Sequence, residues 1–235
     1  MKTKTFRLDR FMQKQMGIAL SAVRLLVAQK RIYIDGECAT NVQQLIGEFT
    51  VVVLDSQVLQ ENQPRYIALH KPKGIVSATS DKSHTTVIDL LPQDVGEGLH
   101  LVGRLDFNST GLMLLTNDGR WSRGVNDSVK KVPKHYRVTL DKPIDHAVVA
   151  AFNAGIYFSY EDITTQPAQL NIISPFEAEV ILTEGRYHQI KRMFGHFQIE
   201  VLTLHRFKIG RFELEDDLPE GTYRLLTDIE RRLIL

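Results

Sequence analysis

The stretch GRLDFNSTGLMLLTNDG, residues 103–119, places one carboxylate, Asp106, between two apolar runs. The apolar alternation over residues 101–105 predicts a strand that ends just before Asp106, and a second apolar strand follows within five residues. Burying a carboxylate at such a junction costs free energy unless a cation or hydrogen-bond donors compensate it. Asp106 is therefore the first candidate for chemistry, and a satisfied structural acid is the alternative.

The compensating cation is expected from EGRYHQIKRMF, residues 184–194. A helix that turns Ile190 inward leaves Lys191 and Arg192 near one edge. One of these two cations can pair with Asp106 and keep the carboxylate ionised. The sequence does not choose between them.

Three further segments carry polar or aromatic groups. Tyr136, in the predicted strand KHYRVTL, offers a flat surface on which a nucleobase can stack, although an isolated strand tyrosine usually serves packing. KPKG, residues 71–74, is a basic turn when taken alone. TNDG, residues 116–119, has the asparagine, aspartate and glycine typical of a turn.

Several classes of chemistry have no support in the sequence. There is no phosphate-binding GxxxxGK[ST], no dinucleotide-binding GxGxxG and no metal-ligand cluster, since the eight histidines are scattered without HExxH spacing. The single cysteine, Cys38, excludes an intrachain disulfide and fits a reducing compartment. No segment resembles a signal peptide or a membrane span. We expect a cytoplasmic protein that uses no cofactor and no metal and does not associate with membranes.

The elements that must position these groups suggest an α+β fold. From Tyr66 onward the pattern is of short strands separated by turn residues, with fewer helices. Such a pattern favours a mixed, largely antiparallel sheet with flanking helices. The predicted strands cover 66–70, 99–105, 111–116, 136–140, 168–173, 178–183 and 200–207, and the predicted helices cover 145–153 and 187–197, with a short one near the C-terminus.

The N-terminal part has a different character. The first 31 residues hold eight Lys or Arg and one acid, although the whole chain carries a net charge of only +1. Apolar spacing over residues 6–29 predicts two short helices interrupted at Gly17, and Arg31-Ile32-Tyr33-Ile34 followed by Asp35-Gly36 predicts a hairpin. Polar residues 60–66 with Pro64 form the best linker. We therefore predict domains at 1–60 and 61–235.

The first domain resembles the S4-like (alpha-L) RNA-binding module in RLDRF, residues 7–11, in a second basic helix and in the hairpin RIYIDGECATN. On the first helix Arg7, Arg10 and Lys14 are spaced to share one face that can lie along phosphates. A solvated helical hairpin is the alternative. The resemblance implies sequence-independent phosphate contacts. The predicted RNA-binding residues are Arg7, Arg10, Lys14, Arg24, Lys30 and Arg31.

Taken in order, KPKG, the Asp106 stretch, KHY and EGRYHQIKRMF resemble the pseudouridine synthases, and within them the RsuA-like family that modifies ribosomal RNA. The last of these segments is most similar to members acting on the small subunit. The resemblance implies that Asp106 is the catalytic aspartate and Lys191 its basic partner. It also implies that Tyr136 stacks on the target base, Ile190 lines the base pocket, and Arg104 holds the flipped nucleotide or its phosphate.

The implied reaction is isomerisation of a uridine in 16S ribosomal RNA by a monomer, with free RNA or a partly assembled small-subunit particle as substrate. In this interpretation Gly103 and Gly111 let the backbone pass close to the flipped nucleotide. Action on 23S RNA, a nucleoside or glycoside hydrolase with a second carboxylate, and a non-catalytic RNA-binding assembly factor are the alternatives.

Overall fold

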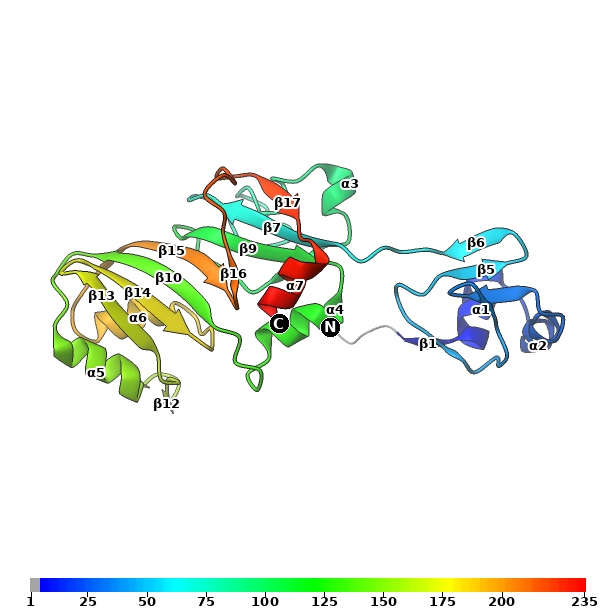
Figure 1. The fold of residues 1–235 in the computed structure, drawn as a ribbon, viewed down its shortest axis with the longest axis horizontal. Helices are drawn as coiled ribbons and strands as arrows, with labels where there is room; N and C mark the ends of the chain where they lie inside the picture. The colour runs from blue at the N-terminus through cyan, green and yellow to red at the C-terminus, as the bar shows by residue number, and fades with distance from the viewer. Residues whose placement is uncertain (1–4) are drawn as a thin grey trace. The chain divides into compact units, whose positions relative to one another are not determined.

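The computed structural model describes residues 5–235 and divides the chain into two compact units, Met1–Pro64 and Arg65–Leu235 (Figure 1). The boundary follows Pro64, inside the predicted linker segment. Lys2 and Lys4, which contribute to the basic N-terminal charge, lie outside the described residues. Each unit has its own hydrophobic core.

Unit 1 contains the two predicted helices, which pack on a small sheet. Gly17 ends the first helix with a left-handed φ of 67°, which accounts for the interruption seen in the sequence. Asp35 and Gly36 both have positive φ, 51° and 86°, as the central residues of a type I′ hairpin turn require. The elements are β1 Phe6–Arg7, α1 Leu8–Met16, α2 Leu20–Ala28, β2 Ile32–Ile34, β3 Glu37–Cys38, β4 Leu45–Ile46, β5 Val52–Leu54 and β6 Gln57–Gln60.

Two sheets organise the strands of unit 1. Four strands follow the order β3-β2-β5-β6, and β1 pairs with β4. Four side chains are fully buried at the centre of unit 1: Leu8 and Met12 of α1, Ile32 of β2 and Val52 of β5. One prediction needs correction here: Arg7 precedes α1 as its extended N-cap, so it does not share a helical face with Arg10 and Lys14.

Unit 2 is built on a nine-stranded mixed sheet, which confirms the predicted fold class. Its main path runs β13-β14-β10-β15-β9-β7-β17, while β16 pairs with β15 and β8 with β9. All pairs are antiparallel except β9 with β15. The strands are β7 Tyr66–Lys71, β8 His100–Val102, β9 Thr110–Thr116, β10 Lys134–Leu140, β13 Gln169–Ser174, β14 Glu177–Leu182, β15 Val201–Ile209, β16 Phe212–Glu213 and β17 Tyr223–Leu225, and β11 Tyr157–Phe158 pairs with β12 Ile163–Thr164 as a separate hairpin.

Helices cover both faces of this sheet, which explains the continuous apolar run of β9. On one face Met113 and Leu115 pack in the cluster that includes residues of α5 and α6. On the other face Leu112 and Leu114 pack in the cluster that includes residues of α4 and α7. In Figure 1 α5 lies against β13 and β14, and α4 lies close to α7. The helices are α3 Gln93–Gly96, α4 Gly119–Asn126, α5 His146–Ala154, α6 Gln189–Gly195 and α7 Asp228–Ile234.

The parallel contact of β9 with β15 depends on Gly111. This residue has a φ of 109°, and a Cβ built on it would lie 2.2 Å from the backbone oxygen of Arg206. Only glycine permits that approach. The sequence-based interpretation of Gly111 as a place where the backbone meets the nucleotide was therefore wrong: a neighbouring strand occupies that space.

Helix α4 was not predicted, because TNDG was interpreted only as a turn. Asp118 is its N-cap, and its side chain accepts hydrogen bonds from the backbone N–H groups of Arg120 and Trp121.

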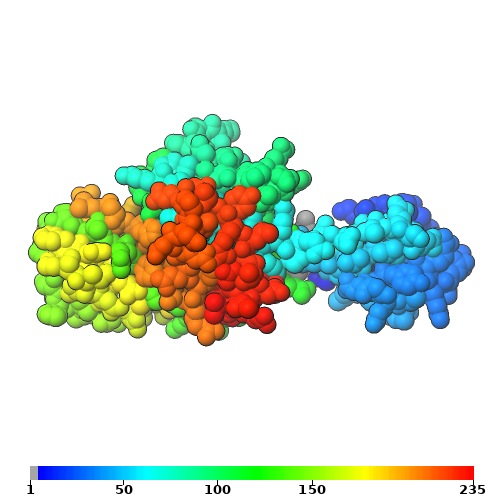
Figure 2. Space-filling model, turned by 45° about the horizontal axis from the view of Figure 1, so that its top comes forward, coloured from blue at the N-terminus to red at the C-terminus, as the bar shows by residue number. Residues whose placement is uncertain are grey.

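The C-terminal residues, orange to red in Figure 2, lie at the surface of unit 2 and end in α7. Among residues 5–235, no helix has the length and apolar character to cross a membrane.

Candidate active site

The sequence-predicted residues of unit 2 meet around one cavity of about 720 Å³. The cavity lies beside the junction of β9 and β15 and draws its walls from the β8–β9 loop, β10, the loop before α6, and β15. Asp106, Arg104, Tyr136, Ile190 and Lys191 all line it. Residues to which the sequence had assigned no role also contribute, among them Ser77, Asn126, Lys134, Tyr187, His188 and Arg206.

The loop that carries Asp106 is held from behind by the segment that begins with KPKG. Ser77 Oγ donates to the carbonyl oxygen of Leu105 at 2.5 Å and accepts from its N–H at 3.1 Å. The backbone N–H of Gly74 donates to the carbonyl of Phe107. Because these contacts fall on both sides of Asp106, they fix where its carboxylate points.

Lys71 completes this support from inside the protein. Its side chain is fully buried, and Nζ donates to the carbonyl oxygens of Pro72, Phe107 and Ser109 at 3.0, 3.3 and 2.9 Å. Burial lowers the pKa of Lys71 to about 8, although the negative charges of Asp106 and Glu220 oppose the shift. The first lysine of KPKG is therefore an internal brace rather than part of a simple basic turn.

Two basic side chains approach the carboxylate of Asp106. Lys191 Nζ lies 3.3 Å from Oδ2, and His188 Nε2 lies 3.5 Å from Oδ1. The Asp106 side chain is 26% exposed, so it remains accessible from the cavity. Arg192 is engaged elsewhere, by Glu161, which answers the question that the sequence left open.

His188 is the residue at this carboxylate that sequence reasoning missed. It is the N-cap of α6, with a left-handed φ of 49°, and it stacks on Tyr187. The eight histidines were tested only for metal-ligand spacing, whereas the useful signal was the place of His188 directly before the helix that carries Lys191. This position lets both His188 and Lys191 reach Asp106.

The apolar and aromatic walls of the cavity come from Tyr136 and Ile190, which are 8% and 3% exposed. Tyr136 lies on β10 directly beside Arg206 of β15. The buried guanidinium of Arg206 donates from Nε to the carbonyl of Leu112 at 2.8 Å and lies 5.9 Å from the centre of the Tyr136 ring. No sequence signal marked Arg206, because its neighbours come from a strand about 90 residues earlier.

Two more cations line the cavity. Arg104 is exposed, its carbonyl accepts a 3.4 Å hydrogen bond from Arg206 Nη1, and within residues 5–235 no partner is recorded for its guanidinium. Lys134 donates to the carbonyl of Val125 at 3.2 Å. Burial, with the nearby charge of Arg206, lowers the pKa of Lys134 to about 8. The walls are therefore rich in positive charge, which suits a polyanion.

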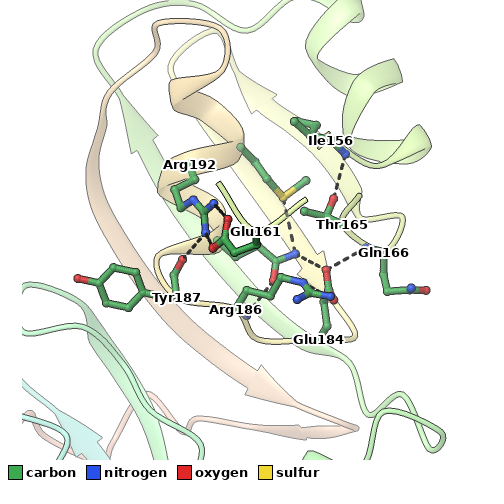
Figure 3. Close-up of polar contacts among 10 residues, drawn as sticks. Ile156, Glu161, Thr165, Gln166, Glu184, Arg186, Tyr187 and Arg192 are labelled. Carbon is green, nitrogen blue, oxygen red and sulfur yellow. Dashed lines mark hydrogen bonds and ion pairs between the residues drawn. The ribbon is translucent and has the colours of Figure 1, made fainter. Parts of the chain in front are cut away.

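A hydrolase would need a second free carboxylate beside Asp106, and the two other acids of the motifs, Asp118 of TNDG and Glu184 of EGRYHQIKRMF, do not provide one. Asp118 caps α4 and accepts from Tyr66 Oη at 2.7 Å, and it does not line the cavity. Glu184 lines the cavity, but its oxygens accept from the Gln189 side chain, the Gln166 backbone and Arg186 (Figure 3). The two-carboxylate arrangement of hydrolases therefore has no support here.

The six basic residues predicted to contact RNA all lie on unit 1. Arg7 donates to the buried Asp9, and this hydrogen bond lowers the pKa of Asp9. Arg31 pairs with Asp55 through two hydrogen bonds of 2.8 and 2.7 Å. The other four have exposed side chains that form no ion pair in the described part of the chain: Arg10, Lys14, Arg24 and Lys30. In that same part no group of three potential ligand side chains could hold a metal ion.

Comparisons with known proteins agree with this geometry. The sequence model of RNA pseudouridylate synthase matches residues 65–196. The chain is 47% identical over 221 residues to ribosomal small subunit pseudouridine synthase A of Pseudomonas aeruginosa, covering 94% of this chain and 96% of that protein. It is 38% identical over 225 residues to the protein of the same name from Escherichia coli, covering 95% and 97%. A crystal structure of a pseudouridylate synthase superposes with a TM-score of 0.72 at 34% identity, covering 98% of this chain and 100% of that one.

Proposed function

The chain belongs to the RNA pseudouridylate synthase family, and from that premise we propose that it converts a uridine of 16S ribosomal RNA into pseudouridine with Asp106 as the catalytic group. One observation carries the assignment: Asp106 opens into a cation-rich cavity and lies within 3.5 Å of both Lys191 and His188. Lys191 brings a positive charge to this carboxylate, and the cavity leaves the carboxylate open to the substrate.

The reaction breaks the bond between ribose C1′ and N1 of uracil, turns the detached base, and joins C1′ to C5. N1 gains a proton and C5 loses one, so the product has the mass of the substrate. No electron, group or nucleotide energy is transferred. The chain therefore has to supply only a pocket for the extracted nucleotide, an anion at the sugar and a surface on which the base can turn.

The described side chains suit those tasks. Tyr136 and Ile190 offer the walls against which a uracil ring can stack. Arg104 lines the cavity with an exposed guanidinium, which is suited to the phosphate of the extracted nucleotide. Lys191 pairs with Asp106 and orients its carboxylate in the cavity. Extraction of the base costs a few kcal/mol, which these contacts must offset.

Asp106 can act in two ways, by attack on C1′ or by removal of a sugar proton to give a glycal-like intermediate. Both ways need the carboxylate in its ionised form. They differ in whether a carbon–hydrogen bond of the ribose breaks. RNA carrying deuterium at ribose C2′ would convert more slowly only by the second route, so the isotope effect on single-turnover rates separates them.

The choice of the small subunit rests on the relatives, which are named for that subunit and match at 37–47% identity over most of the chain. The remaining parts of the proposal are a cytoplasmic monomer and a substrate that is either free 16S RNA or a partly assembled particle. Modification of 23S RNA is the alternative. Unit 1 is proposed to be the S4-like domain that holds the RNA backbone through its four unpaired cations.

The test is incubation of the protein with unmodified 16S and 23S RNA, followed by mapping of pseudouridine. We expect one site in 16S RNA and none in 23S RNA. The matched control is Asp106→Asn, which removes the charge but keeps the shape, and which should bind RNA without converting it. Conversion at the wild-type rate by this variant would sink the assignment, and release of free uracil would indicate a hydrolase.

A further inference from the structure

Two aromatic rings stand together at the rim of the cavity. The ring of Tyr187 stacks on that of His188 with centroids 3.9 Å apart and planes 17° apart, and both residues line the cavity. Tyr187 is nevertheless 71% exposed. Since one face of its ring is covered by His188, the opposite face must be open to solvent.

The main chain at Tyr187 is held firmly although its ring is exposed. Its carbonyl accepts from Arg192 Nη1 at 3.4 Å, and Arg192 is itself paired with Glu161 and lies 3.8 Å above the ring of Phe158. Figure 3 shows this polar network, with the Tyr187 ring directed away from it. The stack on His188 restrains the Tyr187 ring, which reduces the conformational freedom that binding would otherwise cost.

The backbone conformation of His188 sets the position of its ring. A φ of 49° is uncommon for a residue other than glycine and costs on the order of 1 kcal/mol. That strain places the imidazole between the Tyr187 ring and Oδ1 of Asp106. The stacked rings of Tyr187 and His188 therefore extend from the solvent-exposed rim of the cavity to the carboxylate of Asp106.

The surroundings indicate what would bind to the open ring face. Arg104, Arg186 and Lys191 line the same cavity, so a ligand that reaches Tyr187 crosses a positive surface. Flat rings attached to a polyanion are nucleobases, and single-stranded RNA is recognised by stacking of its splayed bases on exposed aromatic side chains. The 3.9 Å spacing of the two protein rings is also close to the ~3.4 Å rise of stacked nucleotides.

Building on the proposed function, we propose that the outer face of Tyr187 binds the nucleobase adjacent to the target uridine. When the uridine enters the cavity, the neighbouring base stacks on the face of the Tyr187 ring that lies opposite His188. The target must then have an unpaired neighbour on one side. Tyr187 thus selects for the single-stranded setting of the uridine, whereas Tyr136 and Ile190 hold the uridine itself.

The experiment uses the full-length protein and a short RNA that spans the mapped uridine. Its neighbours on the 5′ and 3′ sides are made abasic one at a time, and affinity and single-turnover rate are measured for wild type, Tyr187→Ala and Tyr187→Trp. Tyr160→Ala is the matched control, because Tyr160 is 95% exposed and does not line the cavity.

For the intact RNA, Tyr187→Ala should weaken binding by roughly 5- to 160-fold, the range that corresponds to loss of one stacked base. Tyr187→Trp should bind like wild type, and so should Tyr160→Ala. One of the two abasic RNAs should weaken wild-type binding as much as the alanine substitution does. The same RNA should cost Tyr187→Ala almost nothing more, because the stacking partner is already absent.

Three results would overturn the proposal: wild-type affinity in Tyr187→Ala, fully additive losses with both abasic RNAs, or an equal loss in Tyr160→Ala. The abasic RNAs test the contact with unaltered protein, so the outcome does not depend on the folding of a variant. Failure of the proposed function would look different, since wild type would then convert no uridine in either ribosomal RNA, and the inference would fall with it.

Discussion

The two units use charged side chains in contrasting ways. In unit 1 four predicted RNA-binding cations are exposed without a recorded acid partner in the described chain, and the Arg31–Asp55 pair is exposed as well. In unit 2 Lys71 and Arg206 are buried and donate to backbone carbonyls. Exposed charges are screened by salt and contribute in small increments, whereas buried donors fix the position of the chain segments they hold.

This contrast predicts two kinds of response to substitution. Substitutions at the junction of β9 and β15, or among the residues that support the Asp106 loop, should cause large losses of stability or activity, because these groups are tightly packed and hydrogen-bonded. Changes at the surface of unit 1 should cause graded losses that depend on salt. A large, salt-independent loss from a surface substitution in unit 1, or a small, salt-dependent loss from a substitution at the junction or loop support in unit 2, would contradict the contrast.

The largest effect is expected for Gly111→Ala. A Cβ at this position would lie 2.2 Å from the Arg206 carbonyl oxygen, on a backbone with a φ of 109°. Overpacking and the unfavourable φ together should lower the free energy of unfolding by at least about 3 kcal/mol. Chemical denaturation followed by tryptophan fluorescence measures this loss, because Trp121 is in unit 2.

The control for that experiment is Gly221→Ala. Gly221 also has a positive φ, 81°, but no atom lies within 4 Å of the Cβ position. Only the backbone strain of about 1–2 kcal/mol should remain. Equal losses in the two variants would mean that the approach of β9 to β15 is not the reason for glycine at position 111.

The next largest effect is expected for Lys71→Met, which keeps the length of the side chain but removes the hydrogen bonds that Nζ donates to the carbonyls of Pro72, Phe107 and Ser109. We expect a loss of about 2–4 kcal/mol in unfolding free energy and slower conversion of RNA, because the Asp106 loop loses its brace. Arg137→Met, on an exposed side chain of β10, is a control that should lose neither.

Lys71 also gives this comparison a pH dependence. Its pKa is about 8 in the folded protein, against 10.5 for an ordinary lysine, so between these values the unfolded chain binds more protons. Stability of wild type relative to Lys71→Met should therefore rise from pH 8 to 10.5, and this gain should be absent below pH 8. A relative stability that stays flat over this window would contradict the buried environment of the amine.

The sequence predicted the local elements well, for physical reasons. The continuous apolar run of β9 and the alternation in β10 give the strands, and Asp35-Gly36 gives the hairpin turn. Asp106, Tyr136, Ile190 and Lys191 were found because their motifs lie close to one another in the sequence or carry the family resemblance.

What the sequence did not predict depends on contacts between distant segments. Arg206 reaches the cavity because β15 runs parallel to β9, and the internal role of Lys71 depends on the loop that folds over it. The turn residues of TNDG proved to start a helix, since Asp118 serves as both turn former and cap. Local patterns carry no record of such tertiary partners.

A smaller effect is expected in unit 1 from neutralising its four unpaired cations one at a time, as Arg10→Gln, Lys14→Gln, Arg24→Gln and Lys30→Gln. Each cation that contacts a phosphate should reduce the slope of log affinity against log salt by about 0.7–0.9. The conversion rate at saturating RNA should stay unchanged, because the cavity lies wholly in unit 2. Binding titrations at several salt concentrations measure the slope. Four unchanged slopes would remove the support for unit 1 as an RNA-binding domain.

The smallest effect, and one of opposite sign, is expected for Asp55→Asn. The hydrogen bonds from Arg31 lower the pKa of Asp55, so at neutral pH the two side chains neutralise each other. Removing the acid leaves the Arg31 guanidinium available for a phosphate, so RNA binding should tighten at low salt and the salt slope should steepen by less than one. The unfolding midpoint should not move beyond the scatter of repeats, because an exposed pair contributes little to stability.

Asp55→Asn combined with Arg31→Gln should return the slope to its wild-type value. If Asp55→Asn instead destabilised the protein as much as Lys71→Met, the Arg31–Asp55 pair would support the fold. The contrast between exposed charges in unit 1 and buried donors in unit 2 would then be wrong.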